Sequence, residues 1–240
     1  MKARARKNRI TVPTRSARRF YGHGIPNVDL AKLSGKLIVV EGADGSGRST
    51  QIAQLVEWLE TGGRPTGQVG LKRSTLVSEE LEKAQDGNVL SRTTLSLFYA
   101  TDFADQLENI ILPALKAGFI VLSDRYIFTA LARAGVRGVD RAQLRSLYGY
   151  AIAPHLVFYL NIDVKTLIGR VLASRGMNFW EAGMDMKTGD DIYDSFRAYQ
   201  NKLLREYNSM ADEFHFHNVD ARRPIDLIQE ELRRQVGAFL

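Results

Sequence analysis

One short segment constrains the fold of this chain more than any other. Residues 42–50 read Gly-Ala-Asp-Gly-Ser-Gly-Arg-Ser-Thr, after an apolar run at 37–41 (LIVVE) and before apolar residues that recur at helical spacing over 52–59. A glycine-rich turn between a buried strand and an amphipathic helix lets main-chain N–H groups point inward at the positive end of the helix dipole. The segment therefore predicts a phosphate-binding loop (P-loop) rather than a plain connection.

Two residues of this loop carry specific chemistry. The hydroxyl of Ser49 is a suitable Mg²⁺ ligand, and a cation at position 48 would cover nucleotide phosphates. Position 48 is Arg where the common pattern has Lys. The exchange is not neutral, because Arg is a planar fork and Lys is a compact point charge.

Strand-like and helix-like segments alternate after residue 35. Buried strands are predicted at 37–41, 119–122, 156–162 and 214–219, with a weaker strand at 67–71, and helices at 52–61, 77–85, 93–116 and 225–236. This alternation predicts an α/β fold with a parallel sheet and helices on both faces. We expect one domain over residues 35–240.

The N-terminal residues differ in composition from the rest. Residues 1–28 hold eight Lys and Arg side chains and no acid, whereas the whole chain has a net charge of +6, so the remainder is slightly acidic. We expect residues 1–34 to form a flexible basic extension. Contact of this extension with nucleic acid, an acidic partner or a neighbouring subunit is the less favoured alternative, and an organelle transit peptide is less favoured still.

Composition excludes several classes of protein. The chain has no cysteine, which rules out disulfides, zinc–thiolate sites, Fe–S clusters and a thiol nucleophile. No apolar run approaches the roughly 20 residues of a membrane span, and the basic extension lacks the apolar stretch of a secretory signal. We expect a cytoplasmic protein with no membrane partner.

A second motif, Asp124-Arg125-Tyr126, follows the predicted strand 119–122. Ligands collect at the carboxyl ends of parallel strands. There, Asp124 could hold the waters of Mg²⁺, and Arg125 could grip phosphate oxygens with its bidentate fork. The alternative is a structural Asp–Arg pair that caps the next helix.

These motifs, in this order, resemble the thymidylate kinase (dTMP kinase) family over residues 36–236. The matching stretches are 41–51, the Leu-Phe-Tyr-Ala segment at 97–100, 120–126, 154–163, 180–185 with Ser195-Phe196 and Tyr199-Gln200, and 219–225. The resemblance implies the P-loop NTPase fold of nucleoside monophosphate kinases, a three-layer sandwich with a five-stranded parallel sheet and a mobile lid. It also implies transfer of the γ-phosphoryl of ATP to a nucleoside monophosphate with Mg²⁺, and a homodimer.

The resemblance assigns roles to individual residues. The ATP-binding set would be Gly42, Asp44, Gly45, Ser46, Gly47, Arg48, Ser49 and Thr50. The catalytic set would be Arg48, Asp124, Arg125 and Arg175, with Ser49 and Asp124 at the metal. The acceptor set would be Asp44, Arg73, Phe98, Tyr99, Asp102, Arg125 and Arg133. Arg175 is preferred to Arg170 as the lid arginine because Gly176 follows it; a solvated surface role is the alternative for either.

The acceptor side departs from the family pattern. Residues 71–75 replace the family's Arg-Glu-Pro-Gly-Gly-Thr run, although Arg73 could still bind phosphate. The family arginine that reads the thymine edge corresponds to Asp102 or Phe103, and its Tyr-Gln pair corresponds to Arg133-Ala134. If Asp102 faces the base it would favour an edge that donates hydrogen bonds; otherwise it points into solvent and shape selects the base.

Three functions follow from these residues. The first is a kinase that converts dTMP to dTDP, and the second is a related kinase with another acceptor. The third is a nucleotide-binding protein with weak turnover, because Arg48 replaces the usual lysine.

Overall fold

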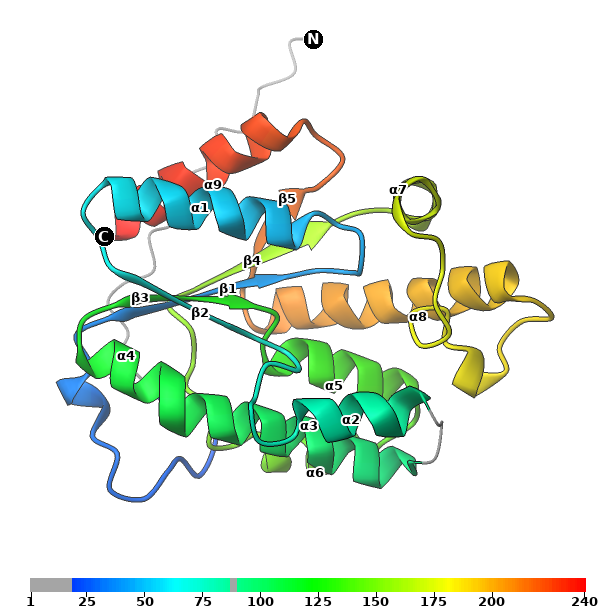
Figure 1. Cartoon of the computed structure of the whole chain (residues 1–240), viewed down its shortest axis with the longest axis horizontal. Coiled ribbons are helices and arrows are strands. Elements are labelled where there is room, and N and C mark those ends of the chain that lie inside the picture. The colour runs from blue at the N-terminus through cyan, green and yellow to red at the C-terminus, as the bar shows by residue number, and fades with distance from the viewer. Residues whose placement is uncertain (1–18, 87–89) are drawn as a thin grey trace, which may run out of the picture.

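The computed structural model describes residues 19–86 and 90–240. Its centre is one sheet of five parallel strands in the order β2-β3-β1-β4-β5 (Figure 1). The strands are β1 (Lys36–Glu41), β2 (Thr66–Gly70), β3 (Ile120–Asp124), β4 (Leu156–Asn161) and β5 (His217–Asp220). This topology confirms the predicted α/β fold of a P-loop NTPase.

Strand β1 lies in the middle of the sheet because its side chains are apolar on both faces. Leu37 and Val39 pack into one core, and Ile38 and Val40 pack into the other. The carboxyl end of β1 therefore lies between those of β3 and β4, with Val40 in register with Asp124. The P-loop follows β1 directly, at the point where the strand order changes direction.

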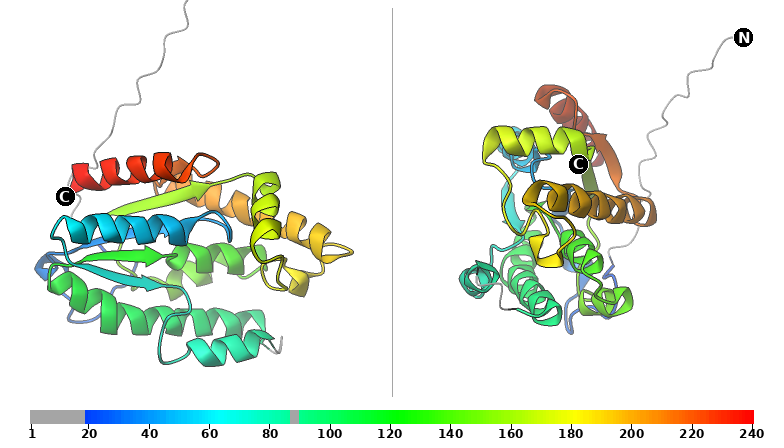
Figure 2. Two further views of the ribbon diagram at one scale, coloured as in Figure 1. Left: turned by 45° about the horizontal axis from the view of Figure 1, so that its top comes forward. Right: turned by 90° about the vertical axis from the view of Figure 1, so that its right-hand side faces the viewer.

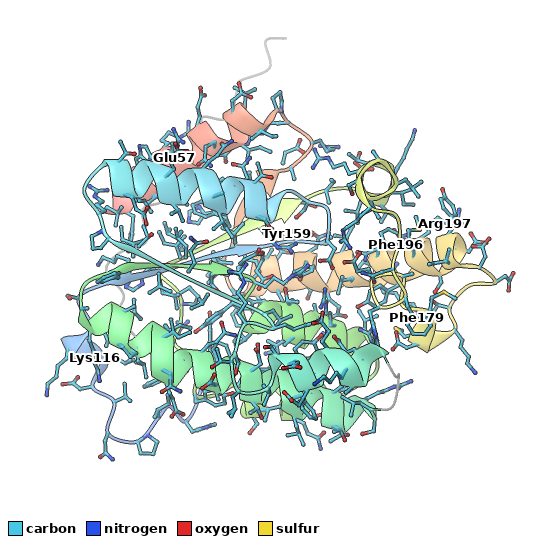
Figure 3. The ribbon with its side chains drawn as sticks, in the orientation of Figure 1. Glu57, Lys116, Tyr159, Phe179, Phe196 and Arg197 are labelled. Carbon is cyan, nitrogen blue, oxygen red and sulfur yellow. The ribbon has the colours of Figure 1, made fainter. Side chains whose placement is uncertain are left out.

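Helices cover both faces of the sheet (Figures 1 and 2). One layer holds α1 (Arg48–Thr61), α7 (Val164–Ser174) and α9 (Ile225–Phe239). The opposite layer holds α3 (Arg92–Gln106), α5 (Ile127–Val136) and α8 (Ile192–Glu213), with the shorter α2 (Ser78–Asp86), α4 (Leu112–Lys116) and α6 (Arg141–Leu147) beside them. Figure 3 shows Tyr159 inside these layers and Glu57, Lys116 and Arg197 on the outside.

Two predicted elements differ in detail. The helix expected at 93–116 comprises α3, a π-helical turn η2 (Leu107–Ile111) and α4. The strand expected at 214–219 begins only at His217, because Phe214 is the C-cap of α8 and His215 has a positive φ of 55°.

The described part of the predicted N-terminal extension is docked on the domain. Phe20 forms an antiparallel bridge with Ile152, and the ring of Tyr21 packs edge-on against Phe128 and Phe214. The structured chain therefore begins well before the boundary expected at residue 34, because aromatic side chains anchor it. Residues 1–18, which carry most of the basic charge, lie outside the described residues.

Within residues 19–86 and 90–240, the helices are too short or too polar for any of them to cross a membrane.

Candidate active site

The P-loop has the backbone geometry of an anion-binding turn. Gly42, Gly45 and Gly47 have φ values of 150°, 87° and 98°. A Cβ on Gly42 would lie 2.7 Å from the Ser46 Oγ and 3.0 Å from the Leu160 carbonyl oxygen, so only glycine fits there. Gly47 is the N-cap of α1 and supplies no side chain to its first turn. The N–H groups of that turn can therefore bind an anion.

Ser46 adds a polar group to the same loop. Its side chain is 1% exposed, and its Oγ has no hydrogen-bond partner among the described residues. Buried hydroxyl groups without a partner are uncommon in folded proteins. Together with the N–H groups of α1, this atom fits a loop that binds a phosphate oxygen.

Arg48 is buried inside the loop rather than directed to solvent. Its Nε donates to Asp124 Oδ1 at 2.8 Å, and its Nη1 donates to the carbonyl oxygens of Gly42, at 2.6 Å, and Ala43. The fork of the guanidinium thus joins both ends of the P-loop to strand β3. A lysine has one nitrogen and could not make these contacts together.

Ser49 and Asp124, the residues predicted to hold the metal, are neighbours. The Ser49 hydroxyl donates to Asp124 Oδ2 at 3.2 Å. Burial opposes ionisation of Asp124, but the charges of Arg48, Arg125 and Arg73 outweigh it and lower the pKa of the carboxyl. A hydroxyl and an ionised carboxylate are hard oxygen donors, and Mg²⁺ commonly takes one or two such ligands plus phosphates. The described residues contain no cluster of three or more His, Asp or Glu for a site built only of protein.

Asp44 lies between two arginines on the other side of the loop. Its Oδ1 accepts from Arg125 Nη2, and its Oδ2 accepts from Arg133 Nη2 at 2.8 Å. Burial opposes its ionisation, but Arg125, Arg133 and Arg48 together lower its pKa far below the usual value. The loop, strand β3 and helix α5 thus bring three guanidinium groups around one carboxylate.

Arg125 is held by residues that sequence analysis did not select. Its φ is 75°, in the left-handed region that non-glycine residues seldom adopt. Its Nη1 donates to Thr129 Oγ1 at 3.0 Å and to the Tyr207 hydroxyl at 3.3 Å. The fully buried Glu41 accepts from the N–H of Tyr126 at 2.8 Å and from Thr129 Oγ1 at 2.7 Å, and so caps α5. The signal in the sequence was the position of Glu41 at the end of β1, directly before the P-loop.

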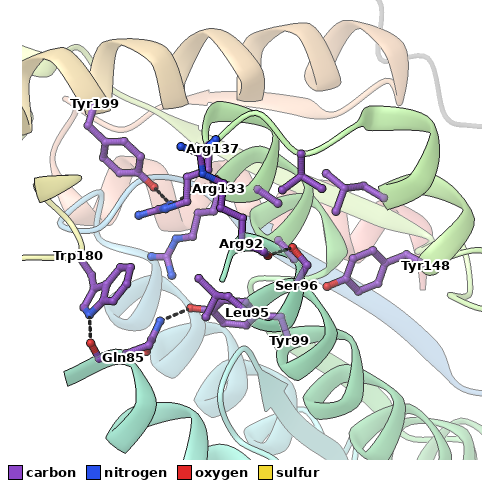
Figure 4. A pocket seen from close by; sticks show the side chains of 14 residues that line it. Gln85, Arg92, Leu95, Ser96, Tyr99, Arg133, Arg137, Tyr148, Trp180 and Tyr199 are labelled. Atoms are coloured by element: carbon purple, nitrogen blue, oxygen red, sulfur yellow. Dashed lines mark hydrogen bonds between the residues drawn. The ribbon is translucent and has the colours of Figure 1, made fainter. Parts of the chain in front are cut away.

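A partly open cavity adjoins the arginines. Figure 4 shows its aromatic walls, Tyr99, Tyr148, Trp180 and Tyr199, which come from separate parts of the chain. Arg133 lines this cavity and also the larger space that contains Asp44 and Arg125. The shared wall puts the cationic end and the aromatic end next to each other.

Asp102 does not point into solvent, so that expectation was wrong, and it is not among the residues that line the aromatic cavity. Its side chain is fully buried, and it accepts from the main-chain N–H groups of Lys72 and Ser74, each at 2.9 Å. Gln106 Nε2 donates to the same carboxylate at 3.1 Å. Burial raises its pKa, although the bonds from the Ser74 and Lys72 N–H groups oppose the change. Asp102 therefore shapes the loop after β2.

The remaining residues predicted to bind the acceptor lie in different parts of the site. Arg73 reaches the phosphate end, where its Nη2 lies 3.6 Å from Asp124 Oδ2. Tyr99 lines the cavity, whereas Phe98 is half-buried and packs against the hydrophobic core.

The two candidate lid arginines occupy different positions. Arg170 donates to the Ala221 carbonyl at 2.7 Å and to the Ser46 carbonyl at 3.4 Å, so it joins the P-loop to the segment after β5. Arg175 is half-exposed and pairs with Glu181 at 2.6 Å. Arg170, which the sequence made the less favoured lid arginine, is thus the one that contacts the P-loop.

The parallel sheet, the P-loop at its switch point and the acid–arginine pairs define a P-loop phosphotransferase of the nucleotide kinase type. More specifically, the chain belongs to the thymidylate kinase family, whose model, described as thymidylate kinase, matches residues 40–232.

Similar proteins agree with this assignment. The chain is 35% identical over 210 residues to a protein named "Probable thymidylate kinase 2" from Saccharolobus solfataricus, covering 87% of this chain and 98% of that protein. It is 36% identical over 215 residues to "Probable thymidylate kinase" of Thermococcus kodakarensis, covering 85% and 98%. It is 30% identical over 195 residues to "Thymidylate kinase" of Brachyspira hyodysenteriae, covering 75% and 92%.

Proposed function

We propose that the protein transfers the γ-phosphoryl group of ATP to dTMP, which yields ADP and dTDP. The observation that carries the proposal is the placement of Asp44 between Arg125 and Arg133, next to the P-loop residue Arg48. In this arrangement, arginine side chains lie on both sides of the position where the γ-phosphate of ATP and the phosphate of the acceptor would meet. The names of the similar proteins support dTMP as the acceptor.

The reaction needs positioning and charge more than chemical participation by side chains. The P–O bond to ADP breaks, and a new P–O bond forms to an oxygen of the acceptor phosphate. That oxygen is already ionised at neutral pH, so no general base is required. Magnesium, when bound, neutralises negative charge on the ATP phosphates.

Each element of the site then has a role. The N–H groups of the P-loop and Arg48 bind the donor phosphates, and Ser49 and Asp124 hold the metal with its waters. Arg125 and Arg133 bind the acceptor phosphate, and Asp44 keeps both guanidinium groups in place before the acceptor arrives. The aromatic cavity beside them accepts the base, with Tyr99 as the stacking residue.

One observation favours a second candidate, a nucleotide-binding protein with weak turnover. Both carboxylate oxygens of Asp124 are engaged, one by Arg48 and one by Ser49. Because metal binding has to compete with Arg48, this pair could slow the reaction. The homodimer stays a prediction from the family resemblance, and the cytoplasmic location stays a prediction from composition.

A coupled assay of ADP release tests the proposal. Wild-type protein would be given ATP and Mg²⁺ with dTMP, dUMP, dCMP, dAMP or dGMP, and we expect the highest kcat/KM with dTMP. Chelation of the metal with EDTA should abolish turnover, and excess Mg²⁺ should restore it. Binding of ATP without ADP release on any acceptor would favour the second candidate. A better acceptor than dTMP would change the substrate but leave the reaction class intact.

A further inference from the structure

Arg137, at the C-cap of α5, makes contacts that the proposed reaction does not use. Its side chain is 6% exposed, which is unusual for a charged residue. Its Nε and Nη2 donate to the two carboxylate oxygens of Asp185 at 2.8 and 2.9 Å, a bidentate pair. Its Nη1 donates to the Tyr199 hydroxyl at 2.8 Å. Nη1 also donates to the Arg133 carbonyl at 3.2 Å, so four directed hydrogen bonds compensate the burial of the guanidinium.

The same guanidinium lies against two aromatic rings of the cavity. Its central carbon is 5.6 Å from the ring centre of Trp180 and 5.0 Å from that of Tyr199. Both distances are within the range of cation–π contacts. Arg137 therefore contacts Trp180 directly and also holds Asp185, five residues further along the same segment.

Trp180 is also held by a second contact. Its Nε1 donates to the main-chain carbonyl of Gln85 in α2 at 2.9 Å, and Gln85 Nε2 donates to the Tyr99 hydroxyl at 2.7 Å (Figure 4). The indole is thus fixed between α5 and α2. The segment from α7 to α8 that carries it contains only the short 3₁₀-helix η3 (Met184–Met186), so regular structure alone does little to fix it.

We infer that Arg137 is a positioning residue for the acceptor cavity: it fixes Trp180 as a wall of that cavity. The inference rests on the proposed function only in calling the occupant of the cavity the acceptor. Arg137 acts through Trp180 rather than on phosphate, because four of its five N–H groups already donate to Asp185, Tyr199 and the Arg133 carbonyl. A wall held within a fraction of an ångström improves acceptor binding by reducing the ordering needed on association.

Tryptophan fluorescence gives a direct test. The chain has two tryptophans, so a Trp58→Phe variant leaves Trp180 as the only indole. Arg137→Lys in that background keeps the charge but removes the fork. We expect the emission of Trp180 to shift to longer wavelength and acrylamide quenching to rise about twofold, without any nucleotide present, because the indole loses its planar partner.

Kinetics of the same variants supply the second measurement. We expect Arg137→Lys to raise the KM of dTMP about tenfold, with kcat within about threefold and the KM of ATP unchanged. Asp185→Asn should change the same quantities in the same direction by a smaller factor. Tyr199→Phe removes one hydrogen bond only and gives the same test if Arg137→Lys does not fold.

Arg145→Lys is the matched control. Arg145 pairs with Glu213 at 2.7 Å and lies 5.8 Å from the ring centre of Phe214, so it combines the same two kinds of contact. It is not among the residues that line the cavity. We expect this substitution to leave Trp180 fluorescence and acceptor KM unchanged.

Two results would overturn the inference. One is wild-type emission and wild-type acceptor KM in Arg137→Lys or, if that variant does not fold, in Tyr199→Phe. The other is a fall in kcat with unchanged KM, which would place Arg137 at the reacting phosphates. The fluorescence measurement needs no substrate. If the wild-type protein phosphorylates no monophosphate and the Trp180 signal still shifts, the positioning role stands and the proposed function fails.

Discussion

Two buried aspartates, Asp124 beside the P-loop and Asp102 beside the loop after β2, show how a charged group of the site differs from a residue that supports it. Asp124 faces cations, and the charges of Arg48, Arg125 and Arg73 lower its pKa despite burial. Burial raises the pKa of Asp102, whose partners are main-chain N–H groups and an amide. The first is a charged group available for chemistry, and the second is a structural anchor. Residue type and burial alone do not distinguish them; their partners do.

The comparison extends to the surrounding regions. The phosphate end is built mostly by short segments, the P-loop and the residues directly after β3, and its strength comes from charge. The base end is built by side chains from α2, α3, α5, α8 and the segment before α8, and depends on their packing. Substitutions at the phosphate end should therefore change turnover, and those at the base end should change acceptor affinity or stability.

The largest effect is expected for Asp124→Asn. The variant keeps the shape but removes the charge that, under the proposed function, would hold the metal, so kcat should fall by about 10²- to 10³-fold. Steady-state assays at saturating ATP and dTMP measure it. Asp102→Asn is the matched control. We expect this substitution to lower the melting temperature by roughly several degrees, while kcat stays within about threefold. Equal losses of kcat in both variants would contradict the distinction between the two ends.

A smaller effect is expected for Arg48→Lys. The lysine restores the common P-loop residue but cannot bind Asp124 and the Gly42 and Ala43 carbonyls together. We expect kcat to fall about tenfold, because the contacts around position 48 depend on the planar guanidinium of arginine. Higher turnover in the variant would show instead that Arg48 limits the reaction and would support the binding-protein alternative.

Arg170 and Arg175 offer a matched pair on the ATP side. Arg170→Ala removes the link between Ser46 and Ala221, and we expect the KM of ATP to rise about fivefold. Arg175→Ala breaks a half-exposed pair with Glu181 and should change that KM by less than about twofold. The reverse ranking would restore Arg175 as the lid arginine that acts on the phosphates.

The smallest effect is expected away from both ends, at His217 in β5. Burial lowers its pKa below 6.5, which outweighs the opposing charge of Glu231. A lowered pKa means that the unfolded chain binds a proton first, so the stabilising contribution is present above pH 6.5 and is lost as pH falls. His217→Gln should therefore flatten the decline in unfolding free energy between about pH 7 and pH 5, measured by urea titration. An unchanged slope would show that this histidine does not contribute.

Local sequence predicted the P-loop, the five strands and the helices near them at 52–61, 77–85, 93–116 and 225–236, because the information there is local, whereas α5 to α8 were not predicted. The glycines of the P-loop and the Asp-Arg-Tyr motif follow their strands directly, and all five strands were predicted. The error at β5 and the late domain boundary have tertiary causes. His215 turns the chain before the strand begins, and Tyr21 finds partners far along the chain.

The base end could not be predicted in the same way. Asp102 bonds the main chain of a loop about thirty residues earlier, so its role depends on the path of that loop. The contacts of Arg137 with Asp185 and of Gln85 with Trp180 join segments that no sequence spacing connects. Glu41 was adjacent to the P-loop, but the sequence did not show that it caps α5.

The most direct test of the account follows the transferred group. Wild-type protein would be mixed with ATP labelled at the γ-phosphate, dTMP and Mg²⁺, and the nucleotides separated at short times. The account predicts label in dTDP, formed in equal amount to ADP, and none with Asp124→Asn on the same time scale. Label that remains in ATP, or appears only as inorganic phosphate, would contradict it.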